Sequence, residues 1–510
     1  MNKNNSKFRN RLKWFRKAAG SVLMIIALLA VSLLSPASVS MAAQKNNTAK
    51  DYQSVEKAYF GKLIDNFTDS YATYAENYKK LASGLATQGT VKVEVNSDLA
   101  AALGLKNFRS VQADVESKLT DKKADSKITY FVNDFKIITL DVLQDLENDI
   151  MYMVIPELSK AYLKISANSL GNTKLFTTKN VIDFFTSDKI SASQLNRLLK
   201  KYANIAISQI KDVSAMDYYT SAGNIGDNQT MYTVKIDKKQ YLAMAENVLK
   251  TARLDEDLKN LLVSLNVCTK EQFVQKIDTA LKSVAQQKKA AASKNENLLT
   301  MEVWVDSQGN VTGREFAFNF NSNTITIGYK ALSNGSNTGI DIWFSPDKGH
   351  TFQLNGTIKE ENGCCNGDLT LTYADLTQKT EQKFDVLLSD ITTFTKDNVN
   401  YVKGNIIITS KALPGFKVEV NLSGSETEQL IKAEVVQGTS KLATVTVNSK
   451  VVPFKDFSLP SESDQIYDFK TQYNEYVKGL DVEGFIADIN SKINLDEINS
   501  LLENAAISYK

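Results

Sequence analysis

Histidine and cysteine, two residue types that often carry acid–base or metal chemistry, are few in this sequence. His350 is the sole histidine, in the stretch SPDKGHTF, and the cysteines are Cys268, Cys364 and Cys365. A Ser-His-Asp triad or a histidine-containing zinc site would have to use His350. A single histidine in a turn between two predicted strands is usually a solvated surface group. We therefore expect neither a histidine-based active site nor a zinc site.

The three cysteines leave more than one pairing open. An odd, small number is not a disulfide framework, and adjacent residues such as Cys364 and Cys365 do not easily reach disulfide geometry with each other. Free thiols are the main expectation, with a bridge from Cys268 to one of the pair or a vicinal bridge as alternatives. The surrounding ENGCCNG is rich in turn formers, which places the pair at or near a hairpin tip.

Two further patterns could support hydrolysis. Ser-x-x-Lys can join a serine nucleophile to a lysine base, but both residue types are abundant here and no Lys-Thr-Gly companion is present, so we interpret these matches as chance. Two facing carboxylates about 5 to 10 Å apart could serve glycoside hydrolysis. Asp145, Glu147 and Asp149 alternate in QDLENDI, and a solvated edge is the favoured interpretation. The Ser-x-x-Lys matches are Ser54–Lys57, Ser208–Lys211 and Ser345–Lys348.

No cofactor is expected. The sequence holds no calcium loop of the Asp-x-Asp-x-Asp-Gly kind and no Gly-Lys-Ser/Thr phosphate loop. Trp304 and Trp343, both in predicted strands, are the candidate ligand-binding residues. Aromatic side chains on the concave face of a curved sheet would suit an amphipathic ligand. The favoured alternative is that both fill the core.

The N-terminus has the three parts of a secretory signal. Residues 1–17 carry seven Lys and Arg and no acid, residues 18–34 are a nearly uninterrupted apolar run, and Pro36 then ends the helix. Small residues follow, so we expect export and cleavage between Ala42 and Ala43. The alternative is an uncleaved anchor, in which residues 18–34 contact the membrane; a run of 17 is at the lower limit for a spanning helix.

Both alternatives place the body of the protein outside the cytoplasm, secreted or on the outer side of the membrane, because the basic flank stays inside. No cysteine lies near the cleavage site for lipid attachment. Without residues 1–42 the chain keeps 53 Lys and Arg against 58 Asp and Glu, a net charge near −5. Such mild acidity argues against a nucleic-acid partner. A hydrophobic content of 43% excludes wholesale disorder.

The hydrophobic pattern changes period along the chain. Residues 51–83 place tyrosines and aliphatic residues at spacings of three and four, which predicts a long helix whose stripe is a packing face. Alternating segments between residues 90 and 155 predict strands. Residues 179–212 and 238–290 predict helices, with a strand between them at 231–237. From residue 298 to about 457, strand follows strand with short Gly-, Asn-, Ser- or Asp-containing links, as in an antiparallel meander.

The fold class predicted is α+β. We expect a large curved antiparallel β-sheet, a meander, with helices packed on its concave side and long N-terminal and C-terminal helices; two similar sheet domains are the alternative. The segments are a signal peptide or anchor at 1–42, an N-terminal helix at 43–88, strands and a helical insert at 89–296, the meander at 297–460 and C-terminal helices at 461–510.

Two stretches resemble known proteins. MEVWVDSQGNVTGREFAFNF, residues 301–320, resembles hairpins of the lipoprotein-carrier fold, in which an incomplete β-barrel wraps helices and its concave face holds acyl chains. MYMVIPELSKAYLKIS, residues 151–166, is similar to segments of uncharacterised exported proteins of anaerobic Gram-positive bacteria. The first resemblance implies a carrier, although many such carriers have the lipidation cysteine that this chain lacks.

These observations favour an exported cell-envelope protein that binds rather than catalyses. Its expected partner is a lipid, a peptide or another amphipathic ligand held by burial of apolar surface. Two other functions stay open: a membrane-anchored extracellular interaction module, and a secreted hydrolase that uses carboxylates. The sequence leaves the oligomeric state undetermined.

Overall fold

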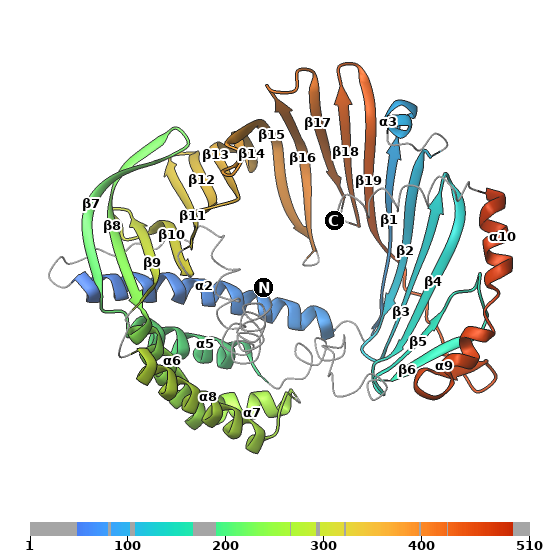
Figure 1. Cartoon of the computed structure of the whole chain (residues 1–510), viewed down its shortest axis with the longest axis horizontal. Coiled ribbons are helices and arrows are strands. Elements are labelled where there is room, and N and C mark those ends of the chain that lie inside the picture. Colours follow the sequence, from blue (N-terminus) through green and yellow to red (C-terminus); the bar gives the residue numbers. More distant parts are fainter. Residues whose placement is uncertain are drawn as a thin grey trace, which may run out of the picture. The chain divides into compact units, whose positions relative to one another are not determined.

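The computed structural model shows an antiparallel β protein with helices, and its chain divides into two compact units (Figure 1). Unit 1 comprises residues 1–73, 187–359 and 369–383, and unit 2 comprises residues 74–186, 360–368 and 384–510. Both units are therefore assembled from separate pieces of sequence. The residues that the structure describes are 48–79, 83–102, 108–166, 190–265, 267–291, 296–320, 323–396, 399–425 and 427–492.

The sheet of unit 1 is antiparallel throughout its described pairings. Its strands are hydrogen-bonded in the order β7–β8–β9–β10–β11–β12–β13. Most neighbours in the sheet are also neighbours in sequence, as expected for a meander. The strands are β7 (Val213–Ala222), β8 (Ile225–Asp237), β9 (Asn297–Val305), β10 (Val311–Phe320), β11 (Asn323–Asn334), β12 (Asn337–Pro346) and β13 (His350–Glu361).

Helices cover one face of this sheet in successive layers. Tyr52, Val55 and Tyr59 of the first helix are buried against β8, β9 and β10. A second helix packs on the first, and residues of three more helices pack against the second (Figure 1). The apolar stripe of the long helix is thus a packing face, as predicted. The helices are α2 (Thr48–Lys79), α5 (Ala192–Ile207), α6 (Lys238–Leu254), α7 (Glu256–Ser264) and α8 (Lys270–Ala291).

The sheet of unit 2 contains strands from an early part and from a late part of the sequence. Its order is β15–β16–β17–β18–β19–β1–β2–β3–β4–β5–β6, so β1 lies between an adjacent strand and one from near residue 450. The strands are β1 (Leu85–Val95), β2 (Ser110–Leu119), β3 (Lys123–Val132), β4 (Phe135–Asp145), β5 (Ile150–Val154), β6 (Tyr162–Ser166), β15 (Thr380–Lys396), β16 (Val399–Ser410), β17 (Phe416–Gly424), β18 (Glu428–Gln437) and β19 (Ser440–Val452).

Short elements complete unit 2. A three-residue strand, β20 (Ile466–Asp468), pairs in parallel with β6 and leads directly into α9 (Phe469–Lys478). Asp468 caps α9 by accepting from the backbone N–H of Lys470 and Thr471. The remaining helices are α3 (Ser97–Ala102) and α10 (Val482–Lys492), and β14 (Cys364–Asp375) has residues in both units.

The predicted meander of residues 298–457 is confirmed, with strands β9 to β19 following one another in sequence. Turn residues act as expected: Asn362 and Gly363 both have positive φ between β13 and β14. The long N-terminal helix is confirmed as α2. The long C-terminal helix is wrong for the described part, because Gly479 ends α9 and α10 starts as a separate short helix.

The signal peptide, the Ala42–Ala43 cleavage site and the apolar run at 18–34 lie outside the described residues. Within the described ranges, no helix combines the length and hydropathy needed to span a membrane. Strand β7 and the short β6 and β20 are additional to the strands that the sequence predicted.

Candidate ligand-binding surface

The structure brings Trp304 of β9 and Trp343 of β12 together. Their rings meet edge to face with centroids 6.3 Å apart. The glycines between them make room: a Cβ on Gly313 would lie 3.1 Å from the Trp304 ring, and one on Gly328 would lie 2.2 Å from the Trp343 ring. Each indole therefore packs directly on the backbone at a strand glycine, and its ring fills the space that a side chain would otherwise occupy there.

Lys330 lies over both indoles. Its Nζ is 4.2 Å from the Trp304 centroid and 5.6 Å from that of Trp343, within the range of cation–π attraction. The Trp343 Nε1–H donates to Glu315 at 2.9 Å. Burial lowers the pKa of Lys330, which neighbouring carboxylates partly oppose. Burial, and then the like charge of Glu315, raises the pKa of Glu302 on the adjacent strand.

The tip of the β7–β8 hairpin closes over the same side of the sheet. A Cβ on Gly339 would lie 1.9 Å from the backbone oxygen of Ala222, and one on Gly223 would lie 2.1 Å from the backbone oxygen of Gly356. Only glycine permits such close backbone approaches. Trp304 is accordingly buried, with 3% of its surface exposed. This geometry supports the core interpretation of Trp304 rather than the ligand-binding one; Trp343 is half-buried.

Unit 1 also holds a buried ion pair that the sequence did not reveal. Arg314 of β10 donates from both terminal nitrogens to Glu56 of α2, at 2.8 and 2.9 Å, and both side chains are almost fully buried. The guanidinium stacks on Tyr59, 4.5 Å from the ring centroid. A bidentate pair fixes the geometry between helix and strand as well as neutralising two buried charges. We assign it a structural role.

The feature of unit 2 with the clearest capacity for binding is one face of its sheet. Because paired residues of an antiparallel sheet share a face, the register places apolar residues side by side over nine neighbouring strands, β15 to β4. One row consists of Leu388, Ile406, Val420, Ala433, Val445, Val93, Val111, Val132 and Phe135. The next row consists of Leu422, Ile431, Val447, Val91, Ala113, Tyr130 and Ile138. We call these two rows the open apolar face.

No residue of the open apolar face is fully buried. Val91 is 43% exposed and Tyr130 is 41% exposed, whereas Val303 in the covered face of unit 1 is 0% exposed. In the described part of unit 2, therefore, these rows are not sealed from solvent as the core of unit 1 is. A contiguous exposed apolar surface of this kind is typical of binding sites and not of an ordinary solvated surface.

The opposite face of the same strands is polar and ion-paired. A Lys-x-Glu pattern recurs on three of them, and in each the lysine pairs with the glutamate two residues on. The Nζ–Oε1 distances are 3.3 Å for Lys92–Glu94, 2.5 Å for Lys417–Glu419 and 2.7 Å for Lys432–Glu434. This polar face is well solvated by water. The apolar face is the one whose exposure to water is unfavourable.

The residues first considered for chemistry form no catalytic arrangement in the described residues. His350 is exposed and stacks on Tyr373, whose hydroxyl lies 2.7 Å from its Nδ1. Asp375 lies 3.9 Å from the same nitrogen. Backbone N–H donors at Gln378 and Thr377 hold the pKa of Asp375 below its usual value, despite an opposing contribution from burial. An imidazole and a carboxylate are present here, but no serine or cysteine contact to His350 accompanies them.

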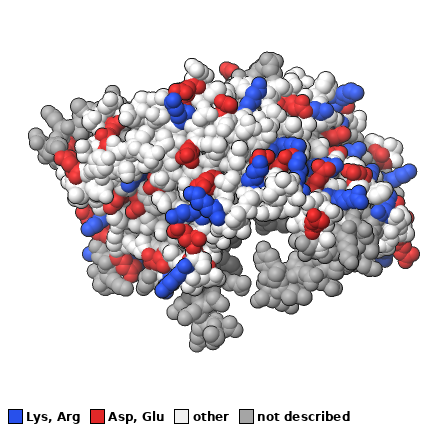
Figure 2. Space-filling view, turned by 90° about the horizontal axis from the view of Figure 1, so that it is seen from above, with Lys and Arg blue, Asp and Glu red and all other residues white. Residues whose placement is uncertain are grey.

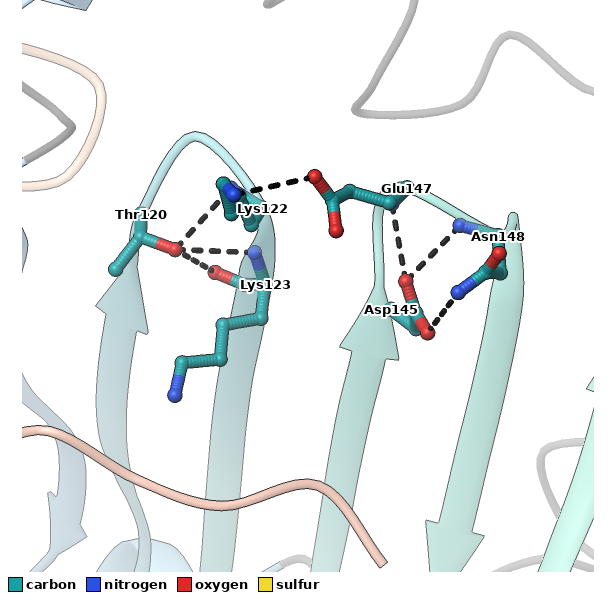
Figure 3. Close-up of polar contacts among 6 residues, drawn as sticks. All are labelled: Thr120, Lys122, Lys123, Asp145, Glu147 and Asn148. Carbon is teal, nitrogen blue, oxygen red and sulfur yellow. Dashed lines mark hydrogen bonds and ion pairs between the residues drawn. The ribbon is translucent and has the colours of Figure 1, made fainter.

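The acidic residues of QDLENDI lie at the turn between β4 and β5 (Figure 3). Asp145 accepts hydrogen bonds from the backbone N–H of Glu147 and Asn148, and from the Asn148 side chain. Glu147 points instead to Lys122 on the neighbouring hairpin, 3.4 Å away. Asp145 therefore stabilises its own turn, and Glu147 links that turn to the neighbouring hairpin. The two acids do not face each other across a cleft.

The serines and cysteines likewise have local roles. Ser54 and Ser208 donate to helix carbonyls four residues earlier, a common helix contact that ties up the hydroxyl. The three cysteines are free, as the main expectation held. Cys364 begins β14 beside the Asn362–Gly363 turn, which confirms the predicted hairpin position, and its sulfur accepts from Thr392 at 3.2 Å.

Neither the potential metal ligands nor the charge distribution on the face drawn in Figure 2 marks a further candidate site among the described residues. The described residues hold no group of three or more His, Cys, Asp or Glu placed for a metal ion. On the face drawn in Figure 2, the basic and acidic side chains of the described residues are interspersed.

Comparison with known proteins assigns no family. No family model matches the chain, and neither does any curated protein. A solved structure described as "Asymmetric conductivity of engineered proteins" aligns at 6% identity over 72% of this chain and 99% of that one, with a TM-score of 0.13. The crystal structure of Pseudomonas aeruginosa OccK11 (OpdR) aligns at 7% identity over 73% and 96%, with a TM-score of 0.14. Scores this low carry no inference about this chain.

Proposed function

We propose that this chain is an exported, non-catalytic cell-envelope protein that holds an amphipathic ligand on the open apolar face of unit 2. The observation that carries the proposal is the register itself: apolar residues from nine consecutive strands lie in unbroken rows, and each of them is exposed or only partly buried.

Binding follows from burial of this surface. Removing apolar area from water contributes about 25 cal/mol per Å². Spacing of about 4.8 Å between strands makes the first row roughly 38 Å long and the second row roughly 29 Å long. A flexible hydrocarbon chain lying across the strands would cover side chains on several of them at once. Because both rows lack ionisable groups other than the Tyr130 phenol, a polar headgroup would remain at the border or in water.

The experiment is displacement of a fluorescent apolar probe from the purified chain by a long-chain fatty acid and by a two-chain phospholipid. Three threonines at Val93, Val445 and Ala433, which are paired in register, keep β-propensity and add a hydroxyl to each position. We expect probe affinity to fall at least tenfold. The matched control places threonine at Lys92 and Lys432 on the opposite face of the same strands, and it should bind as the parent does.

Two results would reject the proposal. One is probe binding that the apolar-face threonines leave unchanged, and the other is an equal loss in the control. Native mass spectrometry of the protein from its own host would then identify a retained ligand directly.

Export is the second part of the proposal, and it rests on residues 1–42. Intact mass separates its two forms. A mass lacking these residues supports release with cleavage between Ala42 and Ala43. A full-length mass supports instead an anchored module, held by residues 18–34, whose open apolar face binds an extracellular partner.

A further inference from the structure

The last described helix of unit 2 ends beside the open apolar face. Helix α10 buries Ile489 and has Lys492 as its final residue. The Lys492 Nζ donates to the backbone oxygen of Lys136 at 3.3 Å. Lys136 directly follows Phe135, which stands at the β4 end of the first row of that face. The chain beyond α10 therefore starts at the border of the open apolar face.

The sequence that follows has the pattern of an amphipathic helix. Residues 493–510 lie outside the described residues, and their sequence is INLDEINSLLENAAISYK. Apolar side chains recur there at alternating spacings of three and four, which predicts a single apolar stripe along a helix. Asn494 suits an N-cap, and two acidic residues follow it in the first turn. The stripe consists of Leu495, Ile498, Leu502, Ala505 and Tyr509.

This predicted stripe matches the open apolar face in length and in chemistry. A helix of 18 residues is about 27 Å long, close to the roughly 29 Å of the second row. The second row has no ionisable group other than the Tyr130 phenol. Asp496 and Glu503 lie on the side of the predicted helix away from the stripe. A helix that lays its stripe on the row would therefore keep these carboxylates in water.

Unit 1 shows how firmly this chain can hold a helix on a sheet face. α2 places Tyr52 and Tyr59 on the apolar face of β8 to β10, and the buried pair of Glu56 and Arg314 fixes the helix there. Neither row of the open apolar face contains a charged residue. A helix on this face would be held by apolar contacts alone, so a ligand that buries the same surface could replace it.

We propose that residues 494–509, the tail segment, form a helix that lies on the open apolar face and competes with the ligand for it. This inference rests on the proposed function, because it takes that face as the ligand site. Tail segment and ligand bury the same rows, so each excludes the other. The apparent ligand affinity is then lower than the intrinsic affinity by the fraction of molecules whose face is free. Ligand binding releases the tail segment.

The first test measures binding of a fluorescent apolar probe, and its displacement by a long-chain fatty acid, in the full chain. Ile498→Asp with Leu502→Asp places two charges in the stripe, so the tail segment should leave the face. We expect probe affinity to rise about fivefold or more. The control is Ser500→Asp with Asn504→Asp, which adds the same charge on the other side of the predicted helix and should bind the probe as the parent does.

The second test locates the tail segment. In a chain whose three native cysteines are serines, Leu502→Cys with Val91→Cys should be joined within one molecule by a short thiol cross-linker, because Val91 lies in the middle of the second row. Saturating fatty acid should suppress this product. Lys92→Cys in place of Val91→Cys is the control; residue 92 lies on the opposite face of β1, and it should not react with residue 502.

Two results would overturn the inference about the tail segment: probe affinity that Ile498→Asp with Leu502→Asp leaves unchanged, or equal cross-linking at residues 91 and 92. Either result leaves the ligand site standing, provided that the apolar-face threonines still weaken probe binding. If those threonines have no effect in the parent or in the Ile498→Asp, Leu502→Asp chain, the proposed function fails, and the competition proposed here fails with it.

Discussion

Strands of both units have the same alternating sequence pattern, but their valines are buried in unit 1 and partly exposed in unit 2. In unit 1, valines of β8 and β9 lie under α2, and Val234 and Val303 have no exposed surface. In unit 2, valines of β1 alternate in the same manner, yet Val91 and Val93 are 43% and 37% exposed. The difference shows that alternation selects a sheet face, while a separate segment decides whether that face becomes a core or stays accessible to solvent.

The largest expected effect concerns the ion pair that joins helix to sheet in unit 1. Glu56→Ala leaves Arg314 buried without a partner, so we expect a loss of about 3 to 5 kcal/mol in unfolding free energy. In unit 2, Glu419→Ala removes a surface pair and should cost about 0 to 1 kcal/mol. Urea unfolding measures both. The double change Glu56→Leu with Arg314→Met should recover most of the loss; equal costs at Glu56 and Glu419 would contradict the contrast.

Strand glycines provide the next comparison. Gly339→Ala drives a Cβ into the backbone oxygen of Ala222, and displacing the hairpin tip should cost about 3 kcal/mol. Gly89 lies beside the open apolar face, where a Cβ would be 3.1 Å from the backbone oxygen of Asn448. Gly89→Ala should cost less than about 1 kcal/mol, because the neighbouring strand can yield slightly. Thermal unfolding of the two variants tests this order, and a reversed order would contradict it.

The same substitution in the two sheets tests the comparison most directly. Val303→Ala removes two buried methyl groups and should cost about 2 kcal/mol. Val93→Ala removes the same groups from an exposed position and should cost less than about 0.5 kcal/mol. If Val93→Ala is as damaging as Val303→Ala in urea unfolding, the face of unit 2 is covered, and the binding proposal fails with it.

The smallest effect is a pH dependence that both units should share. Hydrogen bonds from Lys250 and Lys288 lower the pKa of Glu246 to about 2, and those from Lys432 and Lys441 lower that of Glu434. A carboxylate whose pKa is lower in the folded state stabilises the protein above its unfolded pKa, and the contribution is lost as the pH falls through the folded pKa. At these accessible positions it should not exceed about 1 kcal/mol.

Unfolding of Glu246→Gln and Glu434→Gln against the parent measures this contribution. The difference should be full at pH 7 and should vanish in acid, between about pH 4.5 and 2 for Glu246. A difference that grows on acidification would contradict the assignment of the two lysine clusters.

Much of the fold follows from period and turn chemistry in the sequence. The tyrosine and aliphatic spacing between residues 51 and 83 identified α2, and the strands between 298 and 457 were separated by recognisable turns. The candidate sites were less predictable. Val303 and Val93 have the same local pattern, and Arg314 in REFAFNF reads as an ordinary solvated strand position. The environments of Val303 and Arg314 depend on α2, which is more than 200 residues away in sequence from either β9 or β10, and a local pattern carries no such information.

The position of β1 has a consequence for how the chain folds. As synthesis proceeds from the N-terminus, residues 85–95 are made more than 340 residues before their second neighbour, residues 440–452. Pairing across such a separation in sequence closes slowly. Until β19 has paired, the backbone groups along one edge of β1 are open to pairing with other polypeptide chains. We therefore expect a holding chaperone to engage this strand during biogenesis, and deletion of β19 alone to make the whole of unit 2 aggregate.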